Sequence, residues 1–187
     1  MFTCSISFST RYRILKTPKH RSYVAFTGPT TAPPLQCSES FDLVFAMDSS
    51  GSIGKDNYQK EKNFINGLAN KLVVGPRNVH LGLIVFSDSS IVWLNFGTPT
   101  STNYSSFSEA AVDNAPYLRG RTRIDSALQT AGDVFPEGRQ NQEPQVLILI
   151  TDGRQSNDPG SVPLKTAVQP LRDQGVKVRI FVFHLSF

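Results

Sequence analysis

The chain has 187 residues, 39% of them hydrophobic, which is typical of one soluble globular domain with a substantial core. Its net charge of +4 arises in residues 1–36, which hold five basic and no acidic residues, whereas residues 37–187 hold 14 basic and 15 acidic ones. The near-neutral main part argues against a nucleic-acid-binding domain. No stretch approaches the roughly 18 apolar residues that a membrane span requires.

The composition of residues 1–38 predicts a basic, disordered N-terminal lead segment that contains Pro and Thr. They lack sustained periodicity and end in Thr30-Thr31-Ala32-Pro33-Pro34. The N-terminus shows neither a positive n-region nor an uninterrupted apolar h-region, so no secretory signal is visible. We therefore expect two parts, the lead 1–38 and a domain 39–187.

Apolar runs rich in Val, Ile, Leu and Phe predict strands that are buried on both faces. Four such runs lie at residues 41–47, 80–86, 145–151 and 176–185. A shorter run at 91–96 is expected to form a hairpin with the second run.

Amphipathic segments between the runs predict helices. Residues 57–73 carry Ile65, Leu68, Ala69 and Leu72 at helical spacing, and Asp56 is the expected N-cap. A second helix is expected from Ile124 to Phe135 and a weaker one over 106–114.

A fourth helix is expected over 163–174, closed by Gly175. Pro170 lies inside it and costs about 3 kcal/mol in a helix interior, which predicts a kink or a late start. Strands alternating with helices predict an α/β fold, a Rossmann-like doubly wound and mostly parallel sheet flanked by helices, with one antiparallel edge strand.

Hard oxygen donors stand at the carboxyl ends of two predicted strands, where ligands collect in open α/β sheets. Asp48, Ser50 and Ser52 follow the first strand, and Asp152 follows the third. Thr122 lies in the loop before the Ile124 helix. Carboxylate and hydroxyl oxygens suit Mg²⁺, Mn²⁺ or Ca²⁺, so these five residues form a candidate metal site.

This pattern resembles the metal-ion-dependent adhesion site of von Willebrand factor type A domains. That site combines an Asp-x-Ser-x-Ser strand end, a Thr in a Gly-x-Thr loop and a later Thr-Asp-Gly, and all five positions match here. The resemblance covers residues 41–185, and the phrases 41–45 and 50–53 are most similar to the extracellular-matrix branch of matrilins and collagen-associated modules. It implies that the three hydroxyls bind the ion directly and the aspartates bind it directly or through water.

The resemblance further implies a non-enzymatic, extracellular adhesion domain. The ion, with few carboxylates around it, would hold an acidic side chain of a matrix protein such as collagen. Arg119, Arg121 and Arg123 flank Thr122 and are candidate ligand contacts, or else solvated loop charges.

Two other functions remain open. An intracellular type A scaffold domain agrees with the absence of a visible signal peptide. Cys37 and the similarity of residues 41–45 and 50–53 to the extracellular-matrix branch oppose it. A Mg²⁺-dependent hydrolase is the other, but no catalytic motif is complete: a phosphate loop would need Gly at Ser49, and a nucleophile elbow would need Gly at Ser50. His80 and His184 have no triad partner at an informative spacing.

The chain departs from the family pattern after the last predicted strand, where the family fold continues with a helix, a strand and a helix. We therefore expect an incomplete domain with an exposed apolar edge strand. Cys37, which matrix-type modules often pair with a cysteine near the domain end, is a candidate disulfide residue without its partner. Asn103 begins an N-glycosylation sequon, Asn103-Tyr104-Ser105.

Overall fold

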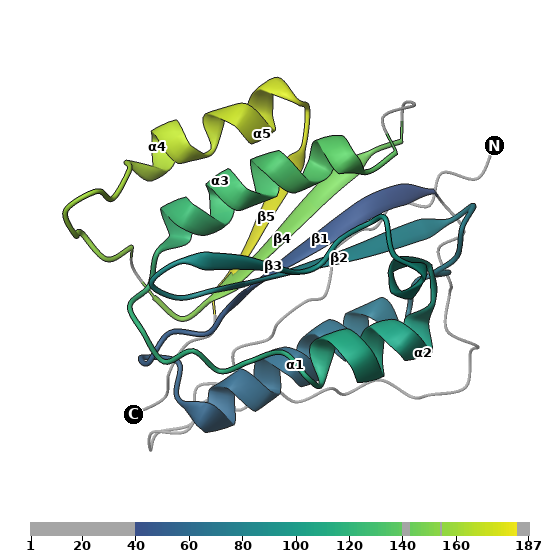
Figure 1. Ribbon diagram of the computed structural model, residues 1–187, viewed down its shortest axis with the longest axis horizontal. Helices are drawn as coiled ribbons and strands as arrows, with labels where there is room; N and C mark the ends of the chain where they lie inside the picture. Colours follow the sequence, from purple (N-terminus) through teal and green to yellow (C-terminus); the bar gives the residue numbers. More distant parts are fainter. Residues whose placement is uncertain (1–39, 140–142, 154, 183–187) are drawn as a thin grey trace, which may run out of the picture.

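The computed structural model describes residues 40–139, 143–153 and 155–182. The expectations for the lead 1–38, Cys37 and His184 lie outside these residues. Five strands form one sheet in the order β3-β2-β1-β4-β5 (Figure 1). Their bounds are β1 Phe41–Asp48, β2 Val79–Phe86, β3 Ser90–Leu94, β4 Gln145–Thr151 and β5 Lys177–Val182.

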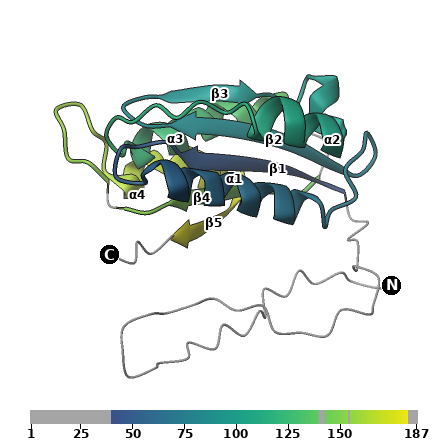
Figure 2. The same cartoon turned by 90° about the horizontal axis from the view of Figure 1, so that it is seen from below.

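All neighbouring strands are parallel except β2 and β3, which form the predicted antiparallel pair. Helices cover both faces of the sheet (Figures 1 and 2). One face carries α1 (Lys55–Ala69) and α2 (Tyr104–Ser106), and the other carries α3 (Ile124–Val134), α4 (Leu164–Ala167) and α5 (Gln169–Asp173). The predicted doubly wound α/β fold is confirmed.

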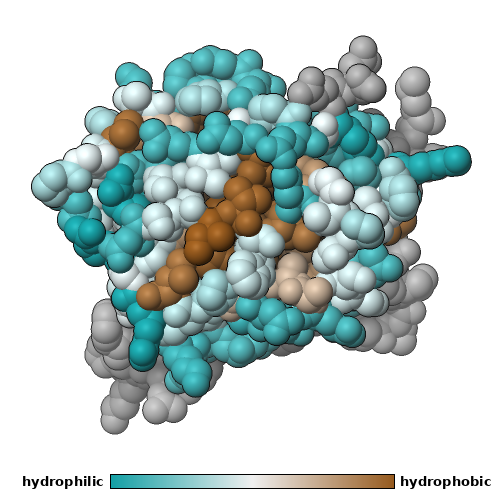
Figure 3. All heavy atoms as spheres, in the orientation of Figure 1, coloured by the Kyte–Doolittle hydropathy of each residue, from teal (hydrophilic) through white to brown (hydrophobic). Residues whose placement is uncertain are grey.

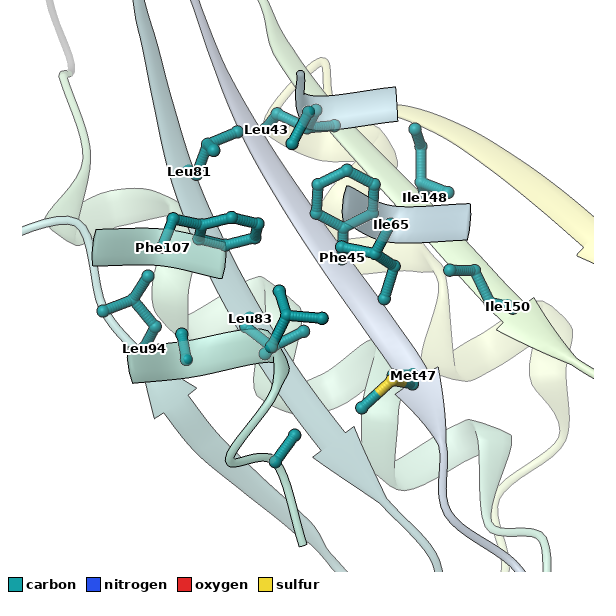
Figure 4. Close-up of a cluster of buried hydrophobic side chains, with 14 of the residues drawn as sticks. Leu43, Phe45, Met47, Ile65, Leu81, Leu83, Leu94, Phe107, Ile148 and Ile150 are labelled. Carbon is teal, nitrogen blue, oxygen red and sulfur yellow. The ribbon is translucent and has the colours of Figure 1, made fainter. Parts of the chain in front are cut away.

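Side chains of the central strand β1 alternate between two apolar cores, because successive residues of a strand point to opposite faces. Leu43, Phe45 and Met47 enter the core beneath α1, which Figure 4 shows, whereas Val44 and Ala46 enter the core beneath α3. All eight β1 residues are buried. β1 is therefore the rigid element from which the predicted metal loop departs.

Two helix predictions need correction. α1 begins at Lys55 and follows Gly54, whose φ of 72° suits glycine, so Asp56 lies in the first turn and is not the N-cap. The helix ends at Ala69 instead of residue 73, because Val74 already bridges to Val79 at the start of β2. The weak helix expected over 106–114 is the short α2 followed by a π-helix, Phe107–Val112.

The effect of Pro170 is confirmed. The segment divides at Val168 into α4 and α5, and Pro170 occupies the first turn of α5, where its missing N–H removes no helix hydrogen bond. Ala167 and Leu171 remain buried in the core beneath α3. The break therefore keeps the apolar face of the segment on the sheet.

A buried ion pair closes the end of the sheet opposite to the predicted metal loop. Asp42 is fully buried, and its carboxylate accepts hydrogen bonds from Nε and Nη2 of Arg139 at 2.9 and 2.7 Å. Arg139 also donates to the carbonyl oxygens of Phe41 and Asn78. One guanidinium thus joins the starts of β1 and β2 to the chain beyond α3.

Apolar side chains are exposed on both edge strands. Ile91, Val92 and Trp93 of β3 are each about 40% exposed. Figure 3 shows an apolar band on one face of the molecule. On β5, Ile180 and Val182 are 61% and 57% exposed, in agreement with the expected apolar edge. Within the described residues, no helix has the length and apolarity needed to cross a membrane.

Candidate metal centre

The register of the sheet brings two strand ends together at the predicted site. Met47 of β1 lies beside Ile150 of β4 in a parallel pair, which places Asp48 next to Thr151. The Thr151 hydroxyl donates to Oδ2 of Asp48 at 2.6 Å, and both residues are buried. This contact fixes the orientation of the Asp48 carboxylate.

Four of the five predicted oxygen ligands form a continuous chain of hydrogen bonds. The N–H of Ser50 donates to Oδ1 of Asp48 at 2.9 Å, and the hydroxyls of Ser50 and Ser52 lie 3.0 Å apart. The Ser52 hydroxyl in turn donates to Oδ1 of Asp152 at 3.2 Å. Ser50 is buried and Ser52 is exposed, so the chain leads from the sheet to the surface.

Thr122, the fifth candidate ligand, lies on a loop whose backbone is hydrogen-bonded to the loop that carries Ser50 and Ser52. The N–H of Gly51 donates to the carbonyl of Gly120 at 2.8 Å, which joins the Ser50 loop to the Thr122 loop. Thr122 exchanges two hydrogen bonds with Ser156: its N–H donates to the Ser156 hydroxyl, and its carbonyl accepts from the Ser156 N–H. Its side chain is buried.

Ser49 anchors the loop that precedes Thr122. Its hydroxyl donates to the carbonyl of Pro116 at 2.9 Å and accepts from the N–H of Leu118 at 2.6 Å. Its carbonyl accepts from the N–H of Arg119 at 2.7 Å. The Tyr58 hydroxyl of α1 adds a second bond to the Pro116 carbonyl. The Ser49 hydroxyl therefore holds the 116–119 loop in place and is not a candidate metal ligand.

The three predicted arginines differ in their surroundings. Arg121 pairs with Asp88 at 2.6 Å and with Asp158 at 3.0 Å, so its charge is offset locally.

Arg123 forms a two-point contact with the buried carboxylate of Asp125, at 2.8 and 2.9 Å. Burial opposes ionisation of Asp125, but hydrogen bonds from Arg123, Val162 and Gln155 outweigh it and hold the pKa of Asp125 well below its usual range. The Arg123 guanidinium is thus occupied by a structural ion pair with Asp125. Of the three arginines, only Arg119 lacks an acidic partner among the described residues.

Electrostatics favour a cation at the oxygen cluster. Burial raises the pKa of the Asp48 carboxyl, hydrogen bonds from Ser50 and Thr151 lower it, and the nearby Asp152 raises it again. Two carboxylates that repel each other beside hydroxyl oxygens are a donor set suited to a hard divalent ion. Across the described ranges no three His, Cys, Asp or Glu side chains are grouped to hold a metal, so an ion at this cluster would need the hydroxyls as ligands.

Sequence reasoning missed three residues around this cluster: Thr151, Ser49 and Glu61. Glu61 on α1 is fully buried, and within the described part of the chain neither of its carboxylate oxygens has a hydrogen-bond partner. A sequence signal existed, since Glu61 stands three residues after Tyr58 and four before Ile65, on the buried face of the helix.

Comparison with known proteins agrees with the fold and the motif. The family model of the von Willebrand factor type A domain matches residues 42–184, and the chain belongs to this family. It is 32% identical over 142 residues to mouse (Mus musculus) von Willebrand factor A domain-containing protein 2, covering 76% of this chain and 17% of that protein. It is 34% identical over 156 residues to human (Homo sapiens) collagen alpha-6(VI) chain, which covers 79% of this chain and 6% of the collagen chain.

Among solved structures, the chain is similar to proximal thread matrix protein 1 of the mussel byssus with a zinc-occupied MIDAS motif. The TM-score is 0.68 at 26% identity, covering 78% of this chain and 36% of that one. The manganese-loaded TRAP protein of Plasmodium vivax shares the fold, with a TM-score of 0.64 at 22% identity over 81% and 60% of the two chains. The chain spans only a small part of the curated relatives named above.

Proposed function

We propose that the chain is a divalent-cation-dependent protein-interaction domain whose ion is held by Asp48, Ser50, Ser52, Thr122 and Asp152. The observation that carries the proposal is the chain of hydrogen bonds that links Asp48 to Ser50 through the Ser50 N–H, and then Ser50, Ser52 and Asp152 through their side-chain oxygens. Mg²⁺ is the ion we favour, with Mn²⁺ or Ca²⁺ as alternatives.

The chemistry of the donor set suits recognition of an acid. A divalent ion whose other ligands are neutral hydroxyls remains a strong Lewis acid and accepts a further carboxylate oxygen from a partner. Thr151 orients Asp48, and Ser52 presents its hydroxyl at the exposed end of the chain. The residues thus reach the protein surface at Ser52.

The loop of Arg119, which lies against Gly51, offers further contacts. Arg119 is exposed and has a positive φ of 69°, and its guanidinium lies 5.7 Å from the ring centroid of Tyr117. Leu118 between them is exposed as well. We assign Arg119 as a ligand contact, because Arg121 and Arg123 are held by aspartates.

The relatives suggest the kind of partner. Collagen chains and a byssus thread matrix protein carry domains similar to this chain. We therefore favour an extracellular location and an acidic side chain of a matrix protein, such as a collagen, as the partner. Asn103 remains a candidate glycosylation site in that setting, and its side chain also caps α2 by accepting from the N–H of Ser106.

A titration of Mg²⁺ by calorimetry, followed by binding to a collagen-coated surface with and without EDTA, tests the proposal. Wild type should bind the ion, and Asp48→Ala should abolish both ion and surface binding. Asp133→Ala, which removes an exposed carboxylate on α3, is the matched control and should behave as wild type. Surface binding that survives both EDTA and Asp48→Ala would exclude the metal bridge.

The same preparations distinguish the hydrolase alternative. Phosphatase and esterase substrates with Mg²⁺ should show no turnover above background. Turnover that Asp48→Ala removes would replace the interaction proposal with an enzymatic one.

A further inference from the structure

Helix α1 carries a carboxylic acid into the core beneath the candidate metal centre. Glu61 lies on the buried face of α1, between Tyr58 and Ile65, and its exposed fraction is 0%. Neither carboxylate oxygen has a hydrogen-bond partner among the described residues. An ionised carboxylate in such a place is strongly disfavoured unless an opposite charge is near.

The charged groups around Glu61 do not supply that opposite charge. Asp48 at the end of β1 and Asp152 after β4 both act on Glu61 as repulsive negative charges, and on its own helix Tyr58 is close enough to be affected by it. The adjacent Lys62 directs Nζ to the carbonyls of Asp113 and Ala115, at 2.8 and 2.9 Å. In the described residues no basic side chain forms an ion pair with Glu61.

Protonation of Glu61 follows from this environment. Burial, then the charge of Asp48 and then that of Asp152, raises the pKa of Glu61 from its ordinary 4.5 to about 10. Two of these three causes are the carboxylates proposed to hold the cation. A divalent ion bound to both carboxylates neutralises them and removes both repulsions, which lowers the pKa of Glu61, whereas its burial remains.

We propose that Glu61 is a proton-carrying acid linked to the cation site, protonated when the site is empty and more readily ionised when Asp48 and Asp152 hold a divalent cation. The O–H bond of the carboxylic acid breaks, the proton passes to the solvent, and the carboxylate remains as a third negative charge near the ion. The inference rests on the proposed cation function and adds a regulator to it. Cation affinity therefore rises with pH, and a divalent ion is favoured over a monovalent one.

Calorimetry of Mg²⁺ binding in two buffers with different ionisation enthalpies, at about pH 8, measures the protons released per ion bound. Wild type should release more protons than Glu61→Gln, by about 0.5 or more, because Gln cannot ionise. The affinity of wild type should also rise more steeply with pH. Glu109→Gln, which alters an exposed glutamate on the π-helix, is the matched control and should resemble wild type.

Glu61→Met, an apolar replacement of similar length, provides the same comparison if the buried amide of Glu61→Gln prevents folding. Equal proton release by wild type and both folded variants would overturn the role of Glu61 while leaving the cation site intact. Absence of Mg²⁺ binding by wild type would overturn the cation site itself, and the linked proton with it.

Discussion

The Thr151 hydroxyl donates to Oδ2 of Asp48 at 2.6 Å, and it also accepts a hydrogen bond from the N–H of Gly153 at 3.2 Å. Thr151 thus connects the end of β4, the turn after Asp152 and the carboxylate of β1. Oxygen ligands whose partners hold them in place bind metal more tightly than ligands that rotate freely.

Thr151→Val should therefore weaken the cation site without removing a ligand. We expect Mg²⁺ affinity to fall about 10-fold, because the buried Asp48 carboxylate loses the donor that orients it. Thr166→Val on the exposed side of α4 is the control and should leave affinity unchanged. Isothermal titration of both variants checks this, and unaltered affinity in Thr151→Val would show that Ser50 alone orients Asp48.

Gly51→Ala should separate the two metal-site loops. A Cβ atom at Gly51 would stand 2.9 Å from the carbonyl oxygen of Arg119, which is backbone and cannot rotate away. We expect a loss of about 1–3 kcal/mol in the free energy of unfolding and a clear drop in Mg²⁺ affinity.

Gly67→Ala is the matched control for this substitution, since a Cβ there meets nothing within 4 Å and α1 should gain up to about 1 kcal/mol. Urea unfolding and Mg²⁺ titration of the pair provide the measurement. If both alanine variants behave alike, the close approach of the loops at Gly51 is unimportant.

Most strands could be predicted, and the candidate ligands could be proposed, because their signals are local. The β1 and β4 runs are continuously apolar, and Asp48 and Asp152 each come directly after such a run. The contact between Thr151 and Asp48 could not be predicted in the same way. It depends on the register between two strands about 100 residues apart, and a shift of one residue would remove it.

Glu61 shows a different limit of sequence reasoning. Its position on the buried face of α1 follows from the spacing to Tyr58 and Ile65, yet a glutamate at the margin of an apolar face ordinarily reaches solvent with its long side chain. Only the packing of α1 on the sheet closes that route. The N-cap prediction at Asp56 was wrong for a related reason, since Gly54 turns the chain into the helix two residues earlier.

Glu61 also predicts an unusual pH dependence of stability in the absence of cations. Its pKa is about 10 in the folded protein and 4.5 ordinarily, so between these values the folded state holds a proton that the unfolded state has lost. The contribution to the free energy of unfolding is complete below about pH 4.5 and is lost progressively as the pH rises towards 10.

Urea unfolding in EDTA at a series of pH values measures this loss. Wild type should lose stability from about pH 5 upwards, and Glu61→Leu should be flatter and about 1–3 kcal/mol more stable near pH 8. Parallel pH profiles for the two proteins would mean that Glu61 finds a partner in solution.

The ion pair of Asp42 and Arg139 should dominate the stability of the opposite end of the sheet. Arg139→Met leaves the fully buried Asp42 carboxylate without its main donor, so we expect a loss of about 3 kcal/mol in the free energy of unfolding. The double variant Asp42→Leu/Arg139→Met should recover part of that loss, because no charge then remains buried. Mg²⁺ affinity should stay unchanged in every variant that folds, since the pair lies at the far end of β1 from Asp48; a fall in affinity would show that the two ends of the strand are coupled.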